Sequence, residues 1–417
     1  MEETGRSVED VLAAIDERRR PEPDVHAGRL FGLVYPSGDD ELEDLERAVS
    51  ERYLFGNALN PFRFPSLADM ERDVVAGVGG LVHLPPGGGG SMTSGGTESI
   101  LMSMLVNRER ARLRGVEHPT ILAPFSAHPA YAKAAHFLGM GIVTVPLADD
   151  LRADVDAARA LVDDDTAVVV ASAFNYPNGI VDPVEELAAL APERGAACHV
   201  DGCIGTFVLP FLEDLGQPVP PWDFRVEGVT EISGDIHKYG YTPKGASVIL
   251  HRDEDWRDLQ WFLYADWPSG IYGSPAVAGA RPAAPIAMAW AAMQHLGRAG
   301  YRAIAETLLE ATNTVRAGVE AIDGLALVGD PVGPVMAIEA TDPALDIFAI
   351  GDDVDANGWF TNRNTSPLSL HVMLSPAHAP LAAQLVADLA AATERNRSAA
   401  AAGGPSDDGG ERQVRYS

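Results

Sequence analysis

The feature of this sequence that most limits its fold is a regular alternation of short apolar segments with amphipathic ones. Each apolar segment is five or six residues long and rich in Val, Ile, Leu and Ala, which is typical of a buried strand. These segments are residues 120–125, 142–146, 167–171, 197–201, 229–233 and 246–251. Helical periodicity fills much of the chain between them, at residues 128–139, 151–163 and 183–193. Strands that alternate with helices predict an α/β fold with a largely parallel sheet, covered by helices on both faces.

The remaining segments predict a division into domains. We expect residues 1–65 to form an N-terminal helix and arm, and residues 66–298 to form the large domain, with the glycine run 87–90 as a loop inside it. Residues 299–398 begin with a long amphipathic helix and predict a small α+β domain. Residues 399–417 are rich in Gly, Ser and Asp, and we expect this tail to be disordered.

Charge and hydropathy exclude several classes of partner. The formal net charge of −29 argues against nucleic acids and against anionic membrane surfaces. No uncharged run approaches the roughly 18 apolar residues of a membrane span, and the acidic N-terminus does not read as a signal peptide. We therefore expect a cytoplasmic protein without a membrane anchor. Cys198 and Cys203 predict reduced, buried thiols rather than a metal site, which would need more ligands.

Lysine is scarce in this chain. Of 31 Lys and Arg residues only three are lysine, namely Lys133, Lys238 and Lys244. The codon usage of a GC-rich genome explains this scarcity, but it makes each lysine informative, because arginine holds its proton too tightly to act as a nucleophile. Lys238 follows the predicted strand 229–233 and could form an imine with an aldehyde if its amine were deprotonated in a dry pocket. The alternative is an ordinary surface lysine.

Three further stretches carry chemistry when they are considered with Lys238. Residues 93–99 place small and hydroxyl side chains at a helix start, which favours an anion site or, alternatively, a simple helix cap. His128 follows a strand and could stack on a planar ligand or face solvent. Asp201 ends a buried strand, where a carboxylate either pairs with a cation such as a protonated pyridine nitrogen or caps the next turn. Together the four stretches predict a site for pyridoxal 5'-phosphate (PLP) and no metal.

Three motifs resemble those of the sphingosine-1-phosphate lyases, a branch of the pyridoxal-dependent decarboxylase (group II) superfamily. They are T-S-G-G-T-E-S-I-L-M at residues 93–102, H-V-D-G-C-I-G at 199–205 and S-G-D-I-H-K-Y-G-Y-T-P-K-G at 233–245. The likeness continues at residues 175–183, 272–282 and 369–378, and covers about residues 30–395. It implies PLP fold type I, with a mostly parallel seven-stranded sheet sandwiched by helices. It also implies a homodimer with interface active sites, in which residues 272–275 serve the partner's site.

The resemblance also implies roles for individual residues. Lys238 would hold PLP as a Schiff base, Asp201 would keep the pyridine nitrogen protonated, and His128 would stack on the ring. Lys244 would contact an anionic group of the substrate or assist proton transfer. The residues implied to bind the cofactor are Ser94, Gly95, Gly96, Thr97, His128, Asn175, Asp201, His237, Lys238 and Ser274. Those implied to bind the substrate are Asn60, Tyr241, Lys244 and Arg281.

The chain departs from the family pattern at positions near the expected substrate. Asn60 and Phe62 stand where the family usually has His and Asp, Ile236 replaces Thr, and Ala280 replaces Ser. The predicted activity is a PLP-dependent retro-aldol cleavage of a phosphorylated β-hydroxy amine, which gives an aldehyde and an amine. An L-amino-acid decarboxylase is the alternative. An aminotransferase is disfavoured because residues 368–376 contain no arginine for an α-carboxylate, although Arg363 could substitute. A non-catalytic protein of this fold is disfavoured by Lys238 and Asp201.

Overall fold

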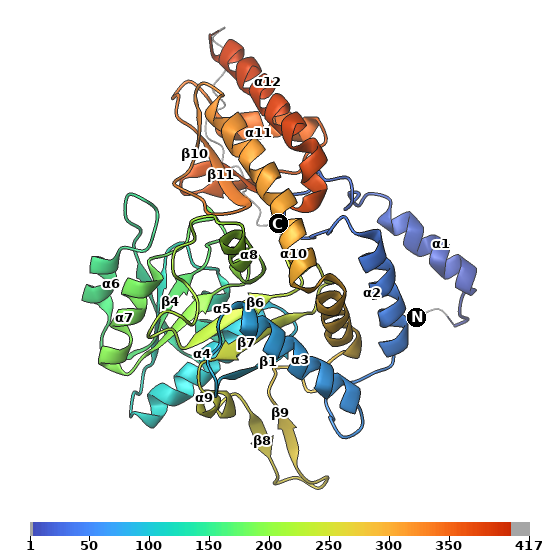
Figure 1. The fold of residues 1–417 in the computed structure, drawn as a ribbon, viewed down its shortest axis with the longest axis vertical. Helices are drawn as coiled ribbons and strands as arrows, with labels where there is room; N and C mark the ends of the chain where they lie inside the picture. Colours follow the sequence, from blue (N-terminus) through green and yellow to red (C-terminus); the bar gives the residue numbers. More distant parts are fainter. Residues whose placement is uncertain (1–2, 402–417) are drawn as a thin grey trace.

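The large domain is built on the mixed, mostly parallel sheet that the sequence predicts, as a computed structural model describing residues 3–401 shows (Figure 1). Its seven strands lie in the order β1-β7-β6-β5-β4-β2-β3. Strand β7 runs in the opposite direction to the other strands of this sheet. The strands are β1 (Gly89–Thr93), β2 (Thr120–Pro124), β3 (Gly141–Val145), β4 (Thr166–Ser172), β5 (Ala197–Asp201), β6 (Glu231–Asp235) and β7 (Ser247–His251).

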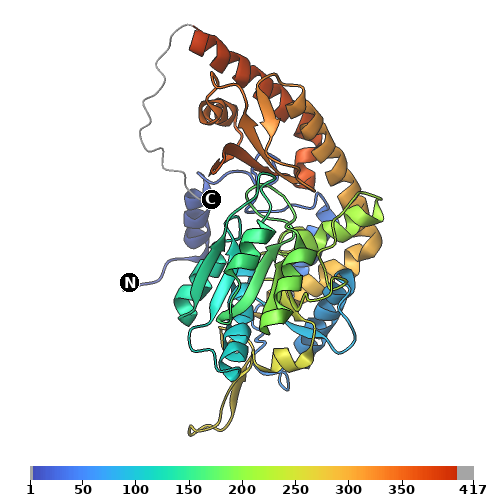
Figure 2. The same ribbon diagram turned by 90° about the vertical axis from the view of Figure 1, so that its left-hand side faces the viewer.

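Helices cover both faces of this sheet (Figure 2). Alternate side chains of β4 enter two different apolar cores, because successive residues of a strand point to opposite faces. Val169 and Ala171 belong to one core, whereas Val168 and Val170 belong to the core beneath α4 and α5. The helices of this domain are α3 (Pro65–Leu81), α4 (Gly96–Leu113), α5 (Ala130–Leu138), α6 (Val155–Leu161), α7 (Val184–Leu190), α8 (Leu209–Asp214) and α9 (Glu254–Asp258).

Strand β1 corrects the prediction of a loop at residues 87–90. Gly89 and Gly90 pair with His251 and Leu250 of β7. A Cβ atom on Gly90 would lie 2.4 Å from the carbonyl oxygen of Ile249, so only glycine allows this close approach. Glycine is otherwise depleted in strands, which is why the sequence pattern indicates a loop here.

The small domain carries an antiparallel sheet in the order β10-β11-β13-β12. A long helix, α10 (Ala283–Glu320), runs from the large domain into the small one and begins well before the predicted residue 299 (Figure 1). It breaks at Gly297, where φ is 53° and ψ is −178°. The other elements are β10 (Leu325–Leu327), β11 (Val335–Ala340), α11 (Ile347–Ala356), β12 (Asn362–Thr365), β13 (Leu368–Met373) and α12 (Ala382–Ala401).

Both ends of the chain bear on the sequence predictions. Helix α12 continues through residues 399–401, which were expected to be disordered, and the rest of that predicted tail lies outside the described residues. At the other end, α1 (Val8–Arg19) buries none of its residues, and α2 (Asp40–Tyr53) packs against α10. A hairpin of β8 (Phe262–Tyr264) and β9 (Tyr272–Ser274) projects from the large domain (Figure 1). Among residues 3–401, no helix is both long and apolar enough to cross a membrane.

Candidate active site

A cavity of about 600 Å³ opens where the carboxyl ends of β5 and β6 meet the start of α4. Open α/β sheets place their ligands at this edge. The cavity brings together most of the predicted cofactor residues. Those in its wall are Ser94, Gly95, Gly96, Thr97, His128, His237 and Lys238, joined by Lys133, Cys203, Asp235, Val277 and Ala278.

The start of α4 forms one wall and is shaped to hold an anion. The helix is 18 residues long, begins at Gly96 and has no side-chain cap on its first turn. A Cβ atom on Gly96 would lie 2.7 Å from Cys203 Sγ and 2.9 Å from the Asp235 carboxylate, so glycine keeps this space open. An uncapped N-terminus presents backbone N–H groups and the positive end of the helix dipole. The space therefore fits the phosphate of PLP.

Lys238 lies across the cavity in an ion pair with Asp235. Its Nζ atom is 3.0 Å from Asp235 Oδ2, and Ser247 Oγ donates a hydrogen bond of 2.5 Å to Asp235 Oδ1. Burial alone would lower the pKa of Lys238, but the Asp235 carboxylate, with smaller contributions from other anionic groups, raises that pKa well above its usual range. In the chain alone Lys238 is thus an ammonium ion, not the deprotonated amine considered from the sequence.

Asp235 is a site residue that the sequence reasoning missed. It is fully buried and ends β6, three residues before Lys238, within the most specific motif of the chain. Burial favours its neutral form, but the charge of Lys238 and the hydrogen bond from Ser247 keep the pKa of Asp235 below its ordinary value. An aspartate at the end of a buried strand is the same signal that singled out Asp201, and it could have identified Asp235 as well.

Asp201 and His128 are the predicted ring-nitrogen partner and stacking residue, and of the two His128 lies in the wall of the cavity. Asp201 is buried at the end of β5, and its Oδ1 accepts a hydrogen bond of 3.0 Å from the backbone N–H of Cys203. His128 Nδ1 accepts a 3.1 Å hydrogen bond from Ala130 N–H, so this nitrogen carries no proton. Burial lowers the pKa of His128, although the Asp201 charge opposes this effect. A neutral imidazole and a buried carboxylate fit the flat, protonated ring of PLP.

A second cavity of about 450 Å³ shares His237 with the first and contains Tyr241 and Lys244. Lys244 Nζ donates a 3.0 Å hydrogen bond to the carbonyl oxygen of His237 and lies 4.6 Å from the centre of the Tyr35 ring. Desolvation of its amine, with a smaller contribution from the charge of Lys238, lowers the pKa of Lys244 to about 8, although the side chain is exposed in the chain alone. Burial raises the pKa of Glu46, in the same cavity, to about 8. Sequence reasoning missed Tyr35, because nothing around it in the N-terminal arm carries a recognised motif.

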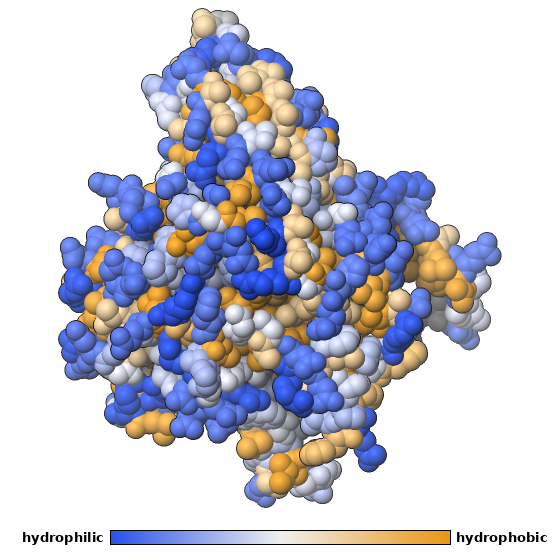
Figure 3. Space-filling model, in the orientation of Figure 1, coloured by the Kyte–Doolittle hydropathy of each residue, from blue (hydrophilic) through white to orange (hydrophobic). Residues whose placement is uncertain are grey.

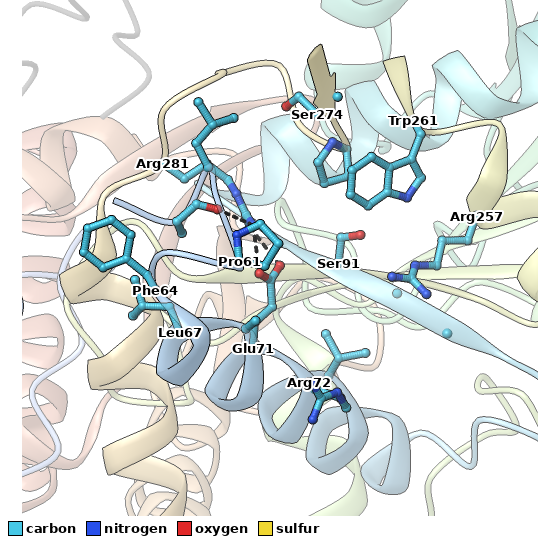
Figure 4. Close-up of a pocket in the computed structure, with 18 of the residues that line it drawn as sticks. Pro61, Phe64, Leu67, Glu71, Arg72, Ser91, Arg257, Trp261, Ser274 and Arg281 are labelled. Atoms are coloured by element: carbon cyan, nitrogen blue, oxygen red, sulfur yellow. Dashed lines mark hydrogen bonds and ion pairs between the residues drawn. The ribbon is translucent and has the colours of Figure 1, made fainter. Parts of the chain in front are cut away.

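Besides the buried Asp201, four predicted residues line neither this cavity nor the cavity that contains Lys244. Asn175 is buried and its Oδ1 accepts a hydrogen bond from the Asn178 backbone N–H. The side chain of Asn60 accepts hydrogen bonds from the backbone N–H groups of the next turn, at residues 62 and 63. Ser274 and Arg281 line a third cavity of about 660 Å³ (Figure 4).

The guanidinium of Arg281 points at the Glu71 carboxylate in that third cavity (Figure 4). The two groups form two hydrogen bonds of 2.8 Å, and this bidentate arrangement fixes the orientation of the two side chains relative to each other. None of Asn60, Ser274 and Arg281 thus lies in the wall of the cavity that contains Lys238. Their assignment to the cofactor and substrate stays a prediction.

Comparisons with known proteins agree with this geometry. The sequence profile described as "Pyridoxal-dependent decarboxylase conserved domain" matches residues 57–337. Sphingosine-1-phosphate lyase 1 of Rattus norvegicus is 38% identical over 375 residues, which cover 90% of this chain and 66% of the rat protein. The chain thus spans about two thirds of the length of that relative. Sphingosine-1-phosphate lyase of Arabidopsis thaliana is 37% identical over 394 residues, covering 92% of this chain and 72% of the plant protein.

Solved structures show the same relationship. The sphingosine-1-phosphate lyase of Burkholderia pseudomallei superposes with a TM-score of 0.91 at 38% identity, covering 97% of this chain and 94% of that one. Glutamate decarboxylase of Lactobacillus brevis superposes with a TM-score of 0.80 at 21% identity, covering 95% of both chains. The second likeness concerns the fold alone, and it confirms the predicted fold type.

Proposed function

The chain belongs to the pyridoxal-dependent decarboxylase family, within its sphingosine-1-phosphate lyase branch, and on this premise we propose that it cleaves a phosphorylated β-hydroxy amine by retro-aldol chemistry. The products would be an aldehyde and a phosphorylated amine. The observation that carries this proposal is the pair of adjoining cavities, one built for PLP and one holding the cation Lys244. Such a cation is suited to bind an anionic group of the substrate.

The residues of the first cavity would hold the cofactor. The N-terminus of α4 would bind the phosphate, His128 would stack on the ring, Asp201 would hold the protonated ring nitrogen, and Lys238 would carry the aldehyde carbon. When bound, PLP supplies an electron sink for the bond that breaks next to the substrate amine. Asp201 supports this sink electrostatically, because a buried carboxylate stabilises a positive charge on the ring nitrogen.

The other residues of the site would bind the substrate and move protons. Lys244 has a pKa of about 8 because its amine is partly desolvated and lies near the charge of Lys238, so near neutral pH it can hold or release a proton at Nζ. Burial lowers the pKa of His237 to about 4, so its imidazole is neutral at neutral pH. Retro-aldol cleavage requires a base for the hydroxyl proton, and a cation would help to bind the phosphate of the substrate. Lys244 is suited to contact the phosphate of the substrate. Lys238, when it is not bonded to the cofactor, is suited to move the proton.

The test of this activity is a comparison of substrate classes. The purified enzyme with PLP would be incubated with phosphorylated long-chain bases and, separately, with a panel of amino acids. We expect aldehyde from the phosphorylated bases and no carbon dioxide from the amino acids. Carbon dioxide without aldehyde would replace the proposal with an amino-acid decarboxylase.

The charge of Lys244 gives a pH prediction. Its ammonium form is present below pH 8 and is lost as the pH rises through about 8, because desolvation of the amine and the nearby charge of Lys238 lower the pKa to that value. A phosphate monoester is already largely dianionic in this range. We therefore expect KM for a phosphorylated substrate to rise about tenfold between pH 7 and pH 9.

The matched variant for this prediction is Lys244→Arg. Arginine stays charged throughout this range, so the rise in KM should disappear, although KM itself can differ from that of the wild type. Lys244→Ala should keep the cofactor bound and show a high KM at every pH. A pH profile of KM that is the same in all three proteins would contradict the proposed role.

We also propose that the protein is a homodimer whose partner subunit completes each active site. Large apolar side chains are exposed on the β8–β9 hairpin, where Ile271 is 79% exposed, and on the N-terminal arm, where Phe62 is 92% exposed. Figure 3 shows apolar residues gathered at the tip of this hairpin. Exposed apolar patches of this kind mark association surfaces. A second chain would also bring the predicted residues Asn60, Ser274 and Arg281 toward a cofactor cavity.

The double variant Phe262→Asp/Ile271→Asp tests this assembly. Both side chains are exposed on the hairpin, so the charges should leave the monomer folded but weaken its association. We expect a monomer by sedimentation velocity and kcat/KM lowered at least about tenfold. Leu113→Asp is the matched control, because Leu113 is 77% exposed at the far end of α4 from the cavity. A double variant that sediments as the wild type does would contradict the hairpin contact.

A further inference from the structure

A buried polar network lies behind the floor of the cofactor cavity and has no part in the chemistry described so far. Its centre is Glu231, the first residue of β6, whose carboxylate is fully buried. Ser103 of α4, His199 of β5 and His251 of β7 surround it and are also fully buried. A carboxylate in such a place needs a compensating charge and satisfied hydrogen bonds.

The compensating charge is His251. Its Nδ1 lies 3.0 Å from Glu231 Oε1, and its Nε2 lies 3.1 Å from the side-chain oxygen Oε1 of Gln260. The Gln260 amide nitrogen is fixed by a 2.6 Å hydrogen bond to the Pro275 carbonyl, so an acceptor faces His251. His251 Nε2–H therefore donates to Gln260, whereas Nδ1 lies within ion-pair distance of Glu231 Oε1 without the alignment of a hydrogen bond. As an imidazolium, His251 is the group placed to offset the charge of Glu231.

The hydrogen bonds on the other side of Glu231 follow from this assignment. Ser103 Oγ donates to Glu231 Oε2 at 2.6 Å, so it must accept its 2.8 Å hydrogen bond from His199 Nδ1–H. A second imidazolium here would be an uncompensated buried charge, and Arg110 adds a further positive charge near Glu231. His199 is therefore neutral, and its Nε2 is an acceptor.

The chain of donors continues to the cofactor cavity. Since His199 Nε2 accepts, the Ser233 hydroxyl donates to it at 3.1 Å. Cys203 Sγ in turn donates to Ser233 Oγ at 3.4 Å. Cys203 lines the cavity, and its backbone N–H holds the Asp201 carboxylate. Four donors therefore follow one another in the order Cys203, Ser233, His199 and Ser103. Each of them donates its hydrogen bond in the direction of Glu231.

We propose that Glu231 is a positioning residue that keeps Cys203 a neutral thiol on the floor of the cofactor cavity, by fixing the direction of this hydrogen-bond chain. In this direction the Ser233 hydroxyl has no proton to offer a thiolate. A thiolate at this place would put a second anion beside Asp201 and would compete with Lys238 for an aldehyde, because the thiolate is the nucleophilic form of cysteine. The proposal concerns the site of the proposed function, but its test needs neither cofactor nor substrate.

The test is alkylation of the cofactor-free chain by iodoacetamide, followed peptide by peptide with mass spectrometry. Asn107 Nδ2 also donates to Glu231 Oε2 at 2.6 Å, so the Glu231 variants are made in an Asn107→Ala background, which serves as their reference. In this background the new amide of Glu231→Gln can donate to Ser103, which allows the whole chain to reverse, so that Ser233 donates to the Cys203 sulfur. We expect Cys203 to be alkylated about tenfold faster near pH 8, which corresponds to a pKa lower by about one unit. Ser103→Ala removes the hydrogen-bond link between Glu231 and His199 but keeps the Glu231–His251 pair. It should also accelerate the alkylation of Cys203, and it replaces Glu231→Gln as the test if that variant fails to fold.

The double variant Glu231→Gln/Ser233→Ala separates this effect from a loosened fold. Without the Ser233 hydroxyl nothing stabilises the thiolate, so the acceleration should be lost. Asp182→Asn is the matched control, since Asp182 is another buried carboxylate, which binds backbone N–H groups of β4 and of residue 153. It should leave the Cys203 rate unchanged. Buried Cys198 reports general opening in every variant.

Two results would overturn the proposal. One is alkylation of Cys203 at the wild-type rate in both Glu231→Gln and Ser103→Ala. The other is equal acceleration in Glu231→Gln and in the double variant, which would mean that the residue only stabilises the fold. Because the assay uses no PLP, either result leaves the proposed lyase activity untouched.

Discussion

Replacing Lys238 by alanine is expected to abolish turnover, with kcat/KM lowered by about 10⁴ or more. Lys238 is the lysine in the cavity wall that is paired with Asp235 and would hold the cofactor covalently. Lys133 also lines this cavity, from α5, and Lys244 lies in the second cavity. The variant should also lose the visible absorbance of the bound cofactor. Absorbance spectra and initial rates of the purified protein check both results.

Lys238→Arg is the matched control for this variant. Arginine preserves the buried ion pair with Asp235, which lies 3.0 Å from the lysine Nζ, so it should fold as the wild type does. Its guanidinium does not lose a proton and cannot form the covalent bond. Both variants should therefore be inactive although only the alanine variant leaves the Asp235 charge unpaired. Activity in either variant would contradict the role of Lys238.

Replacing Asp201 by asparagine is expected to lower kcat about 10²–10³-fold, because a neutral amide does not stabilise the protonated ring nitrogen. The side chain is nearly isosteric and its oxygen can still accept the hydrogen bond from Cys203 N–H. The covalent bond to Lys238 should persist, so the cofactor absorbance should remain while kcat falls. Steady-state rates measured on protein with a known cofactor content check this prediction.

The control for Asp201→Asn is Asp182→Asn, which also neutralises a buried aspartate next to β4 but away from the cavity. Both oxygens of Asp182 accept hydrogen bonds from backbone N–H groups, and asparagine replaces one of these acceptors by a donor, so this change should reduce stability with little effect on kcat. If Asp201→Asn turned over as fast as the wild type, Asp201 would be a structural cap on the 201–203 turn, the alternative that the sequence left open.

Much of the cofactor site is visible in the sequence because it consists of local motifs at strand ends. Lys238, Asp201, His128 and the 94–97 stretch follow strands or begin a helix, and the parallel sheet brings such positions to one edge. The sheet itself follows from apolar runs with turn signals between them. The comparisons confirm the fold type and the dependence on PLP.

The parts that sequence reasoning missed depend on contacts between distant segments. The ion pair of Arg281 with Glu71 joins residues 210 positions apart, and no local pattern indicates it. The position of Tyr35 beside Lys244 is a tertiary contact of the same kind. Strand β1 was not predicted because glycine is depleted in strands, although the tight pairing of this strand with β7 requires glycine. Sequence periodicity records burial and local conformation, but not which partner a charged side chain meets.

The central claim, that Lys238 is the residue that binds PLP covalently, is tested most directly by reducing the holoenzyme with borohydride and mapping the modified lysine by mass spectrometry. The chain has three lysines, so the assignment has three possible outcomes. We predict the reduced cofactor on the peptide containing Lys238 and on neither of the others. An adduct on Lys133 or Lys244, or a cofactor that leaves no adduct on any lysine, would contradict the account.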